Sequence, residues 1–280
     1  MTGEEFEFLA SLLKRGSGLS LTPEKADLIM GRLKAVAERQ GFSSLAALVQ
    51  ALRNGDERLE HSVIEAAATR DTLFFRDSVA FDALRGQILP ALLRARAANK
   101  RLRIWSAAAA TGQEPYSLAM VIDETPQFAG WEIHILATDV SAHAIERATS
   151  GLFSEEEVQR GLPLRLLSKY FRKEPSGWRI SDELRNRVEL RVFNLMDCFA
   201  GLGMFDVIFC RNVLMYLDPE AKSDILERLA GSLERDGYLV LGAAETMLGA
   251  CESFTVLPHF SGIATKARRV PDLRAAVTTL

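Results

Sequence analysis

The chain has 280 residues, of which 48% are hydrophobic and 25% are charged, and this length allows one large globular domain or two modest ones. Its formal net charge of −3 gives no global attraction to nucleic acid or to an anionic membrane surface, so neither is expected as a partner. No apolar run reaches the roughly 18 residues that a membrane-spanning helix needs, and no membrane insertion is expected.

Residues 4–72 carry apolar side chains at helical spacing and no convincing strand. Thr22-Pro23 has the form of a helix cap followed by a first-turn proline, which predicts a helix running to about Gln40. Further apolar stripes of the same period follow it. We expect a bundle of roughly four helices, which would form a helical domain at residues 1–72.

From Leu102 onward, candidate strands alternate with candidate helices, which predicts an α/β fold with a mainly parallel sheet covered on both faces. The last two strands are separated only by a hairpin-sized turn, so the sheet should end in an antiparallel pair. A tight turn is expected at Arg235-Asp236-Gly237. The candidate strands are Arg101–Trp105, Ile133–Thr138, Val188–Phe193, Asp206–Cys210, Tyr238–Gly242, Phe254–Leu257 and Gly262–Thr265.

Residues 150–187 are longer than an ordinary connection between a helix and a strand. Two short β-type runs, Tyr170–Lys173 and Trp178–Ile180, flank a turn that contains Pro175, which predicts an inserted hairpin. Long insertions are often functional, and a solvated excursion is the alternative. The tail from Arg268 to Leu280 is expected to be poorly tied down.

A segment of small residues, Trp105–Ser117, joins the first strand to the next helix. Only Gly112 is present there, so the dinucleotide fingerprint of three spaced glycines is missing. Glu114 stands at the helix start, where it would repel a pyrophosphate but suit a cationic, hydroxyl-rich ligand such as S-adenosylmethionine. An ordinary strand–turn–helix unit with a capping acid is the alternative.

The next two strands also end in polar residues. Asp139 ends the second strand, where an acid can bind a ribose diol, although Asp139 or Ser141 could equally cap the next helix. Asn194 and Leu195 follow the third strand. An amide can pair with an adenine edge while a leucine covers the ring, and a turn-forming asparagine is the alternative.

Arg211, Asn212 and Tyr216 follow the fourth strand and would project from its carboxyl end, where open α/β sheets bind ligands. A further segment, Thr69–Asp77, lies at the junction of the helical and α/β regions. Its Phe74-Phe75 pair is expected to join the bundle to the sheet. Arg76 could simply pair with an acid, but a further role is expected for it.

Together these segments form one ordered set: Thr72-x-Phe-Phe-Arg76, Trp105–Ser117, Asp139, Asn194-Leu195 and Phe209-Cys-Arg-Asn-Val-x-x-Tyr216. The set resembles the CheR-type chemotaxis receptor methyltransferases, from the helical region to about residue 265. The resemblance implies a Rossmann-like class I methyltransferase sheet at 73–268, with an inserted β-subdomain at 150–187 and a tail at 269–280. It also implies methyl transfer from S-adenosylmethionine, leaving S-adenosylhomocysteine, to glutamate side chains on the cytoplasmic helices of chemoreceptors.

Matched residue by residue, the resemblance places eight residues in the cofactor site: Thr72, Arg76, Glu114, Asp139, Asn194, Leu195, Arg211 and Asn212. Glu114 would meet the cationic methionine end, Asp139 the ribose, and Asn194 with Leu195 the adenine. Tyr216 would lie close to the transferred methyl. A glutamate carboxylate is already ionised at neutral pH and needs no general base, so Arg76 and Tyr216 are expected to act by holding and orienting it. No metal site is expected.

Three positions depart from the family pattern. Arg70 stands where relatives often have asparagine, so no cofactor role is carried onto it. Ala243-Ala244-Glu245 replaces a commoner His-Ser-Glu, which weakens any role for that loop. The turn of the inserted hairpin is also shorter than in relatives that dock on a receptor's C-terminal pentapeptide, which favours recognition without such a tether.

Other features concern partners and location. Lys25, Arg32 and Arg39 share one helical face, a basic stripe that could meet an acidic receptor helix or simply be solvated. The three cysteines are far apart and fit reduced thiols, and the acidic start lacks a signal-peptide layout. We therefore expect a cytoplasmic location. A monomer is also expected.

Two alternative functions remain open from the sequence. One is a catalytically weak S-adenosylmethionine-binding module that regulates a chemosensory signalling complex. The other is a small-molecule methyltransferase, for which the helical domain and the inserted hairpin are more than the reaction needs.

Overall fold

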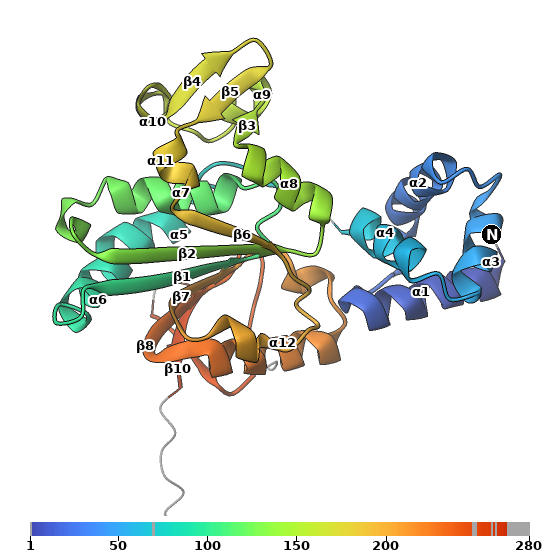
Figure 1. Ribbon diagram of the computed structural model, residues 1–280. Coiled ribbons are helices and arrows are strands. Elements are labelled where there is room, and N and C mark those ends of the chain that lie inside the picture. The colour runs from blue at the N-terminus through green and yellow to red at the C-terminus, as the bar shows by residue number, and fades with distance from the viewer. Residues whose placement is uncertain (1, 69–70, 248–250, 259, 261, 268–280) are drawn as a thin grey trace, which may run out of the picture.

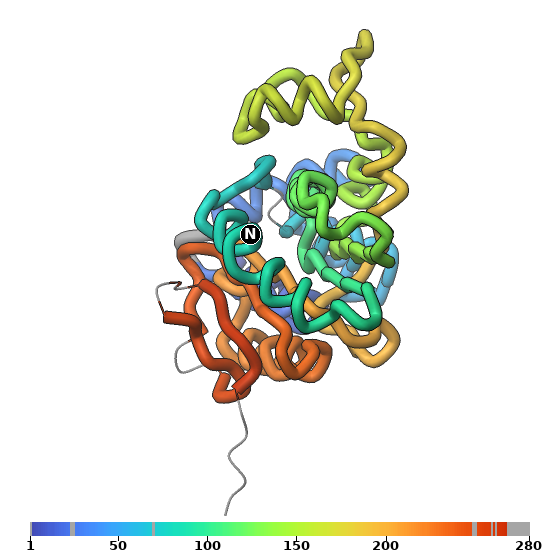
Figure 2. The backbone as a smooth tube through the Cα atoms, turned by 90° about the vertical axis from the view of Figure 1, so that its left-hand side faces the viewer, coloured from blue at the N-terminus to red at the C-terminus, as the bar shows by residue number. Residues whose placement is uncertain are grey.

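The computed structural model describes residues 2–68, 71–247, 251–258, 260 and 262–267, with only the backbone described at 23–25. A group of helices formed by the first part of the chain lies beside a central sheet that helices flank, and a second, small sheet projects from that body (Figures 1 and 2). Among the described residues, no helix combines the length and the apolar character needed to cross a membrane. The expected tail at 268–280 lies outside the described residues.

The N-terminal helices are α1 (Gly3–Ser17), α2 (Pro23–Arg39), α3 (Leu45–Arg53) and α4 (Glu57–Ala67), as the apolar stripes predict. The side chains of Thr2, Ser44 and Asp56 accept backbone N–H bonds at the starts of α1, α3 and α4. The apolar faces of all four helices bury one cluster, which includes Leu9, Leu33 and Val63. The α-helical N-terminal region is therefore confirmed.

The central sheet has seven strands in the order β6-β2-β1-β7-β8-β10-β9. Neighbouring strands from β6 to β8 are parallel, and β10 is antiparallel to both β8 and β9, which confirms the expected fold class. The strands are β1 (Arg101–Ala107), β2 (Glu132–Asp139), β6 (Val188–Val192), β7 (Phe205–Cys210), β8 (Leu233–Val240), β9 (Phe254–Val256) and β10 (Ile263–Lys266).

The central strands carry apolar side chains on both faces of the sheet, and helices cover each face and bury them. On one face, Ile104 and Val207 belong to a cluster that includes α5 (Ser78–Ala83), α6 (Leu89–Ala95) and α7 (Gln113–Asp123). On the other, Trp105 and Ile208 pack with α12 (Pro219–Ser232). Short π-helical and 3₁₀ turns, Leu84–Ile88, Pro126–Phe128, Phe199–Leu202 and Leu214–Tyr216, join these elements.

The prediction of a tight turn at residues 235–237 is wrong. Helix α12 ends at Ser232 and β8 begins at the next residue, so these polar residues lie within an irregular strand. The pairing of β7 with β8 shifts register between Phe205 and Val207, which accommodates the extra length. The Arg96 guanidinium stabilises this irregularity, because it binds Asp206 at 2.7 Å and Asp236 at 2.5 Å.

The expected inserted hairpin forms as β4 (Phe171–Glu174) and β5 (Gly177–Ile180). It belongs to a three-stranded sheet, β3-β5-β4, that the sequence did not predict in full. Strand β3 (Leu152–Phe153) and the helices α9 (Glu155–Gln159), α10 (Leu164–Tyr170) and α11 (Asp182–Arg185) complete the region, whereas the preceding helix α8 (Ala142–Ser150) packs against β2 and β6 of the central sheet. We refer to residues 152–185 as the inserted subdomain; it rises at the top of both views (Figures 1 and 2).

The Phe74-Phe75 pair does not join the helical bundle to the sheet as expected. The Phe74 ring packs edge-on against Phe153 and Phe171 of the inserted subdomain, at centroid distances of 5.0 and 5.6 Å. Gly161 touches the same residue: a Cβ there would lie 2.2 Å from the Phe74 carbonyl oxygen. Phe75 instead packs on Phe81. Phe74 therefore fastens the inserted subdomain to the chain that enters the α/β region.

Replacing Phe74 by alanine should lower the free energy of unfolding by about 3–5 kcal/mol, because a fully buried aromatic ring is lost from a packed aromatic cluster. Urea denaturation measures this loss. The matched control is Val79→Ala at a side chain 63% exposed, which should change the free energy by less than about 0.5 kcal/mol. Equal effects of the two substitutions would contradict the anchoring role of Phe74.

Candidate active site

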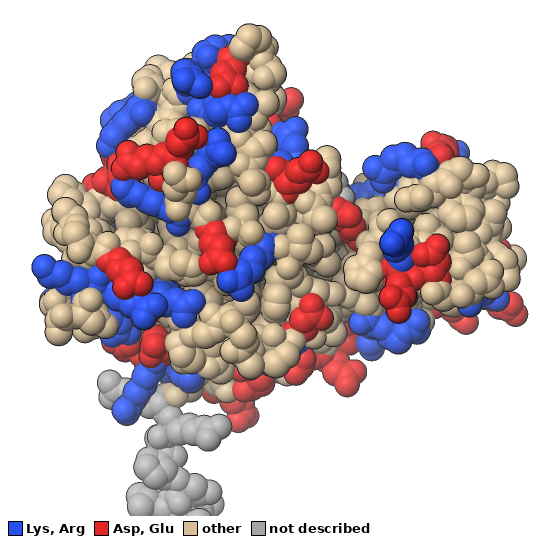
Figure 3. Space-filling model, in the orientation of Figure 1, with Lys and Arg blue, Asp and Glu red and all other residues tan. Residues whose placement is uncertain are grey.

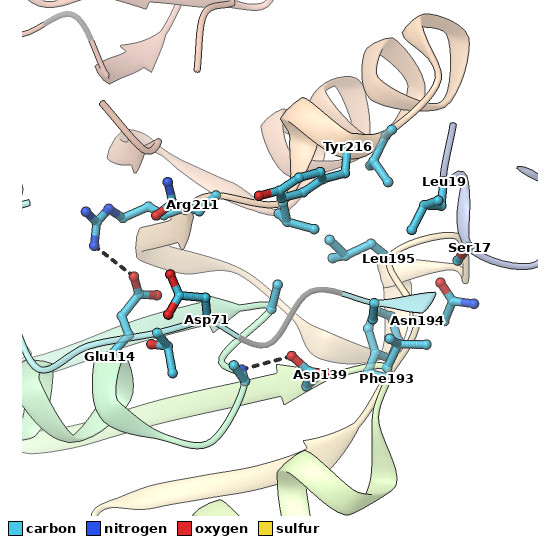
Figure 4. A pocket seen from close by; sticks show the side chains of 18 of the residues that line it. Ser17, Leu19, Asp71, Glu114, Asp139, Phe193, Asn194, Leu195, Arg211 and Tyr216 are labelled. Carbon is cyan, nitrogen blue, oxygen red and sulfur yellow. Dashed lines mark hydrogen bonds and ion pairs between the residues drawn. The ribbon is translucent and has the colours of Figure 1, made fainter. Parts of the chain in front are cut away.

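A pocket opens at the carboxyl ends of β1, β2 and β7, with an empty volume of about 980 Å³ that includes open solvent (Figure 4). Parallel strands direct their carboxyl ends to one edge of the sheet, so polar residues that follow different strands meet there. All the site residues expected from the sequence line this pocket: Thr72, Arg76, Glu114, Asp139, Asn194, Leu195, Arg211, Asn212 and Tyr216. Arg70, for which no role was expected, lies outside the described residues.

Glu114 and Arg211 form a buried ion pair at one side of the pocket (Figure 4). An Arg211 Nη1 hydrogen is donated to Glu114 Oε2 at 3.0 Å, and the Ser106 hydroxyl donates to Oε1 at 2.8 Å. Burial raises the pKa of Glu114, and the neighbouring guanidinium and hydroxyl oppose that rise. The carboxylate is therefore held at the start of α7 by a counter-ion, and it is more than a solvated capping acid.

Arg211 also binds the segment that leads from the helical bundle to α5. Its Nη2 donates to the Arg76 carbonyl and to Asp77 Oδ2, both at 2.8 Å, and its side chain is only 1% exposed. The Nε hydrogen has no hydrogen-bond partner among the residues that the structure describes. The Phe75 N–H donates to Ser117 Oγ at 3.0 Å, so this segment is fixed against α7 as well. One guanidinium thus joins β7, α7 and the entering segment around the pocket.

Asp139 links two loops at the edge of the sheet. Its Oδ2 accepts the N–H of Ala110 at 2.9 Å (Figure 4). Its Oδ1 accepts the N–H of Ser141 at 2.9 Å. Ser141 Oγ caps α8 by accepting the Ala144 N–H at 3.0 Å. The cap that the sequence left open between these two residues therefore belongs to Ser141, and Asp139 orders the loops while lining the pocket.

The side chain of Asn194 contacts the helical bundle. Its Nδ2 donates to the Gly16 carbonyl at 2.6 Å, and its Oδ1 accepts the Met196 N–H at 3.0 Å. An amide has two hydrogens and two lone pairs, so one of each remains for a ligand. Leu195 is buried beside it. The adenine role expected for this pair stays a prediction.

Sequence reasoning missed that the helical bundle supplies part of the pocket wall, through Ser17 and Leu19. Leu19 forms an antiparallel bridge with Leu217, in which the Ser20 N–H donates to the Tyr216 carbonyl at 2.9 Å. Gly18, at φ 70°, permits the approach, because a Cβ there would lie 2.9 Å from Met196 Sδ. No local pattern signals such a contact between residues so distant in sequence.

Two residues of the basic stripe expected on α2 bind backbone carbonyls within the helical bundle. The Nη1 of Arg32 donates to the carbonyls of Ala67 and Ala68, at 3.0 and 3.1 Å, at the carboxyl end of α4. Arg39 binds the Ala35 carbonyl within its own helix at 3.3 Å. The side chain of Lys25 is not described. Arg32 therefore has a structural partner, which neither the recognition hypothesis nor the solvated-face alternative foresaw.

Among the described residues, no group of three or more His, Cys, Asp or Glu side chains could hold a metal ion. Cys210 lies close to the pocket at the end of β7, but burial raises the pKa of its thiol well above the usual range. The arrangement offers carboxylates, a guanidinium pair and a phenol around a partly apolar space. These groups suit the binding and orientation of charged ligands.

Comparison with known proteins gives matches along nearly the whole chain. The model of the CheR methyltransferase all-alpha domain matches residues 4–66, and that of the CheR methyltransferase SAM-binding domain matches residues 70–263. Chemotaxis protein methyltransferase 1 of Pseudomonas aeruginosa is 40% identical over 94% of this chain and 98% of its own length. Chemotaxis protein methyltransferase Cher2 of Pseudomonas putida is 37% identical over 94% and 98%. The chemotaxis protein methyltransferase of Vibrio parahaemolyticus is 36% identical over 96% and 98%.

Replacing Arg211 by methionine should lower the free energy of unfolding at pH 8 by about 3–5 kcal/mol, because Glu114 then stays buried without its counter-ion. The folded-state pKa of Glu114 rises further in this variant, so the folded state binds the proton more tightly than the unfolded state. The loss should therefore shrink at acidic pH and grow as pH rises through that pKa. Urea denaturation between pH 5 and 8 measures it.

Two further variants test the cause of the Arg211→Met effect. Adding Glu114→Gln to Arg211→Met should restore part of the stability and flatten its pH dependence. Arg101→Met removes an exposed ion pair with Glu132, at 3.4 Å, and should cost less than about 1 kcal/mol. A pH-independent loss in the single Arg211 variant would count against the counter-ion role.

Proposed function

We propose that this chain, which belongs to the CheR methyltransferase family, methylates glutamate side chains on the cytoplasmic domains of chemoreceptors. Membership makes it a methyltransferase of the chemotaxis type with S-adenosylmethionine as its cofactor. The glutamate acceptor, the receptor and a cytoplasmic location are the further content of the proposal. The observation that carries it is the convergence of Glu114, Asp139 and Arg76 on one pocket.

The residues of the pocket fit the chemistry of the cofactor. Glu114 offers a buried carboxylate for the cationic methionine end, and Asp139 lies where a ribose diol can be bound. Leu195 and Phe193 give an apolar surface for the adenine ring next to the Asn194 amide. When bound, S-adenosylmethionine supplies an electrophilic methyl group on a positively charged sulfur. Thr72, Arg211 and Asn212 complete the proposed set.

The acceptor requires positioning and no general base. A glutamate side chain with a pKa near ~4.3 is ionised at neutral pH and is already nucleophilic. Arg76 can hold it by a charge-assisted hydrogen bond. In this structure Arg76 Nη1 donates to the Asp71 carbonyl at 2.6 Å, at the pocket lining, so the guanidinium is kept beside the site. Tyr216, which also lines the pocket, can help to orient the carboxylate. Exclusion of water favours a reaction that neutralises charge.

Receptor recognition is proposed to be independent of a pentapeptide tether. Only Pro175 and Ser176 separate β4 from β5, so the hairpin turn offers little surface for an additional peptide. Positive and negative side chains are interspersed on the face shown in Figure 3, so recognition there needs local pairing and no single-sign field. A monomer is proposed to act on the receptor.

The decisive experiment incubates labelled S-adenosylmethionine with purified chemoreceptor cytoplasmic domains and measures base-labile methyl esters. Label released by mild base and mapped to glutamate peptides is the expected result. Binding of S-adenosylhomocysteine without label on any receptor would indicate a regulatory binding module. Label on a small molecule alone would indicate a small-molecule methyltransferase, and either result would overturn the proposal.

Replacing Arg76 by alanine should lower kcat for receptor methylation by about 100-fold, as removal of other single donors at reacting charges does. The affinity for S-adenosylhomocysteine, measured by calorimetry, should stay within about tenfold, because the other pocket residues remain. Arg94→Ala, at an exposed side chain on α6, is the matched control and should retain wild-type kcat. Wild-type turnover in the Arg76 variant would rule out a positioning role for this residue.

A further inference from the structure

Glu245 lies in the loop that follows β8, and its carboxylate binds four backbone N–H groups. Oε2 accepts those of Asn212 at 2.7 Å and Gly242 at 2.8 Å. Oε1 accepts those of Val213 at 3.0 Å and Met215 at 3.2 Å. The side chain is only 4% exposed, so these charge-assisted bonds replace its hydration. We call this arrangement the carboxylate clamp.

The clamp sits between the ends of two neighbouring parallel strands. Residues 212–216 follow β7, and Gly242 comes shortly after β8. Asn212 has a left-handed backbone at φ 57°, a conformation that asparagine tolerates better than most residues other than glycine. A Cβ at Gly242 would lie 2.7 Å from Asn212 Nδ2 and 2.9 Å from Glu245 Oε2. The segment that carries these pocket residues therefore combines a left-handed turn with close packing between the ends of the two strands.

The segment of residues 212–216 is also held from its other side. The Tyr216 carbonyl accepts the Ser20 N–H at 2.9 Å, while the clamp binds the N–H of Met215 immediately before it. Both attachments lie within the 3₁₀ turn Leu214–Tyr216. Asn212 and Tyr216 both line the pocket, so the conformation of this short segment decides where their side chains lie.

We propose that Glu245 is a positioning residue, whose carboxylate fixes residues 212–216 so that Tyr216 and Asn212 meet the reacting groups in the pocket. The proposal rests on the proposed methyl transfer. Ala243 and Ala244, where the chain departs from the family pattern, are exposed, and the departure leaves the clamp intact. The sequence pattern at residues 243–245 argued against a role for this loop. In our proposal Glu245 gives the loop a role although the two residues before it differ from the family pattern.

Charge is the property the clamp needs. Both oxygens of a carboxylate accept hydrogen bonds, and each one here accepts two. A glutamine of the same shape keeps only one oxygen and turns its NH₂ group toward two backbone donors. Glu245→Gln therefore removes hydrogen bonds to backbone N–H groups of the clamp with little change in side-chain volume.

The test compares Glu245→Gln with wild type in kcat, in the affinity for S-adenosylhomocysteine and in amide hydrogen exchange. We expect kcat to fall by at least about 30-fold and the affinity by less than about fivefold, because the cofactor contacts from other segments remain. Exchange at the amides of Asn212, Val213 and Met215 should accelerate at least about tenfold, with exchange in β1 and β2 unchanged. Glu252→Gln, at an exposed acid further along the chain, should match wild type.

A second variant covers the case in which Glu245→Gln does not fold. Gly242→Ala keeps the carboxylate but crowds Asn212 and Glu245, and it should reproduce the fall in kcat and the local exchange. Wild-type kcat in either variant, or equal losses of kcat and affinity with faster exchange throughout the sheet, would overturn the positioning role. If wild type itself methylates no receptor, the proposed function fails. The clamp is then judged by exchange alone, and unchanged exchange at 212–215 would overturn it.

Discussion

The buried ion pair between Arg211 and Glu114 is the interaction on which the rest of the site depends. It connects the end of β7 to the start of α7, and the same guanidinium binds the Arg76 carbonyl and Asp77. Removing two charges from water is costly, and such a pair persists only where geometry and further hydrogen bonds compensate. Those conditions are met because three segments converge on Arg211, which makes this pair a structural and an electrostatic centre at once.

Backbone contacts determine the remaining walls of the pocket. Asp139 accepts N–H bonds from the loops after β1 and β2, and Glu245 accepts four from the chains after β7 and β8. The helical bundle adds a bridge from Leu19 to Leu217 and a contact from the Gly16 carbonyl to Asn194. The pocket is thus ordered before a ligand enters, which reduces the entropic cost of binding and orientation. It also means that the helical bundle is part of the site.

Much of the architecture could be predicted because it depends on local pattern. Periodicity indicated the four N-terminal helices and the alternation of strands and helices, and the short connection after β9 indicated the antiparallel end of the sheet. The errors lie where non-local contacts override local signals. Residues 235–237 resemble a turn, yet Arg96 holds Asp236 in a bulged strand. The position of Phe74 at the junction predicted a contact with the helical bundle, yet its ring packs on Phe153 and Phe171.

From the sequence alone, Glu114, Asp139, Asn194, Arg211 and Tyr216 could be placed at one pocket, because residues that follow parallel strands meet at one edge of the sheet. Thr72 and Arg76 precede the first strand, and only the resemblance to the family placed them there. The contacts that each side chain makes could be read only from the folded structure. Asn194 binds the Gly16 carbonyl, Arg32 binds the end of α4, and Glu245 binds the backbone beside Tyr216. These bonds join residues far apart in the chain, and their partners are backbone groups that every residue carries. No residue pattern can signal such a partner, so its identity is set only when the fold brings the segments together.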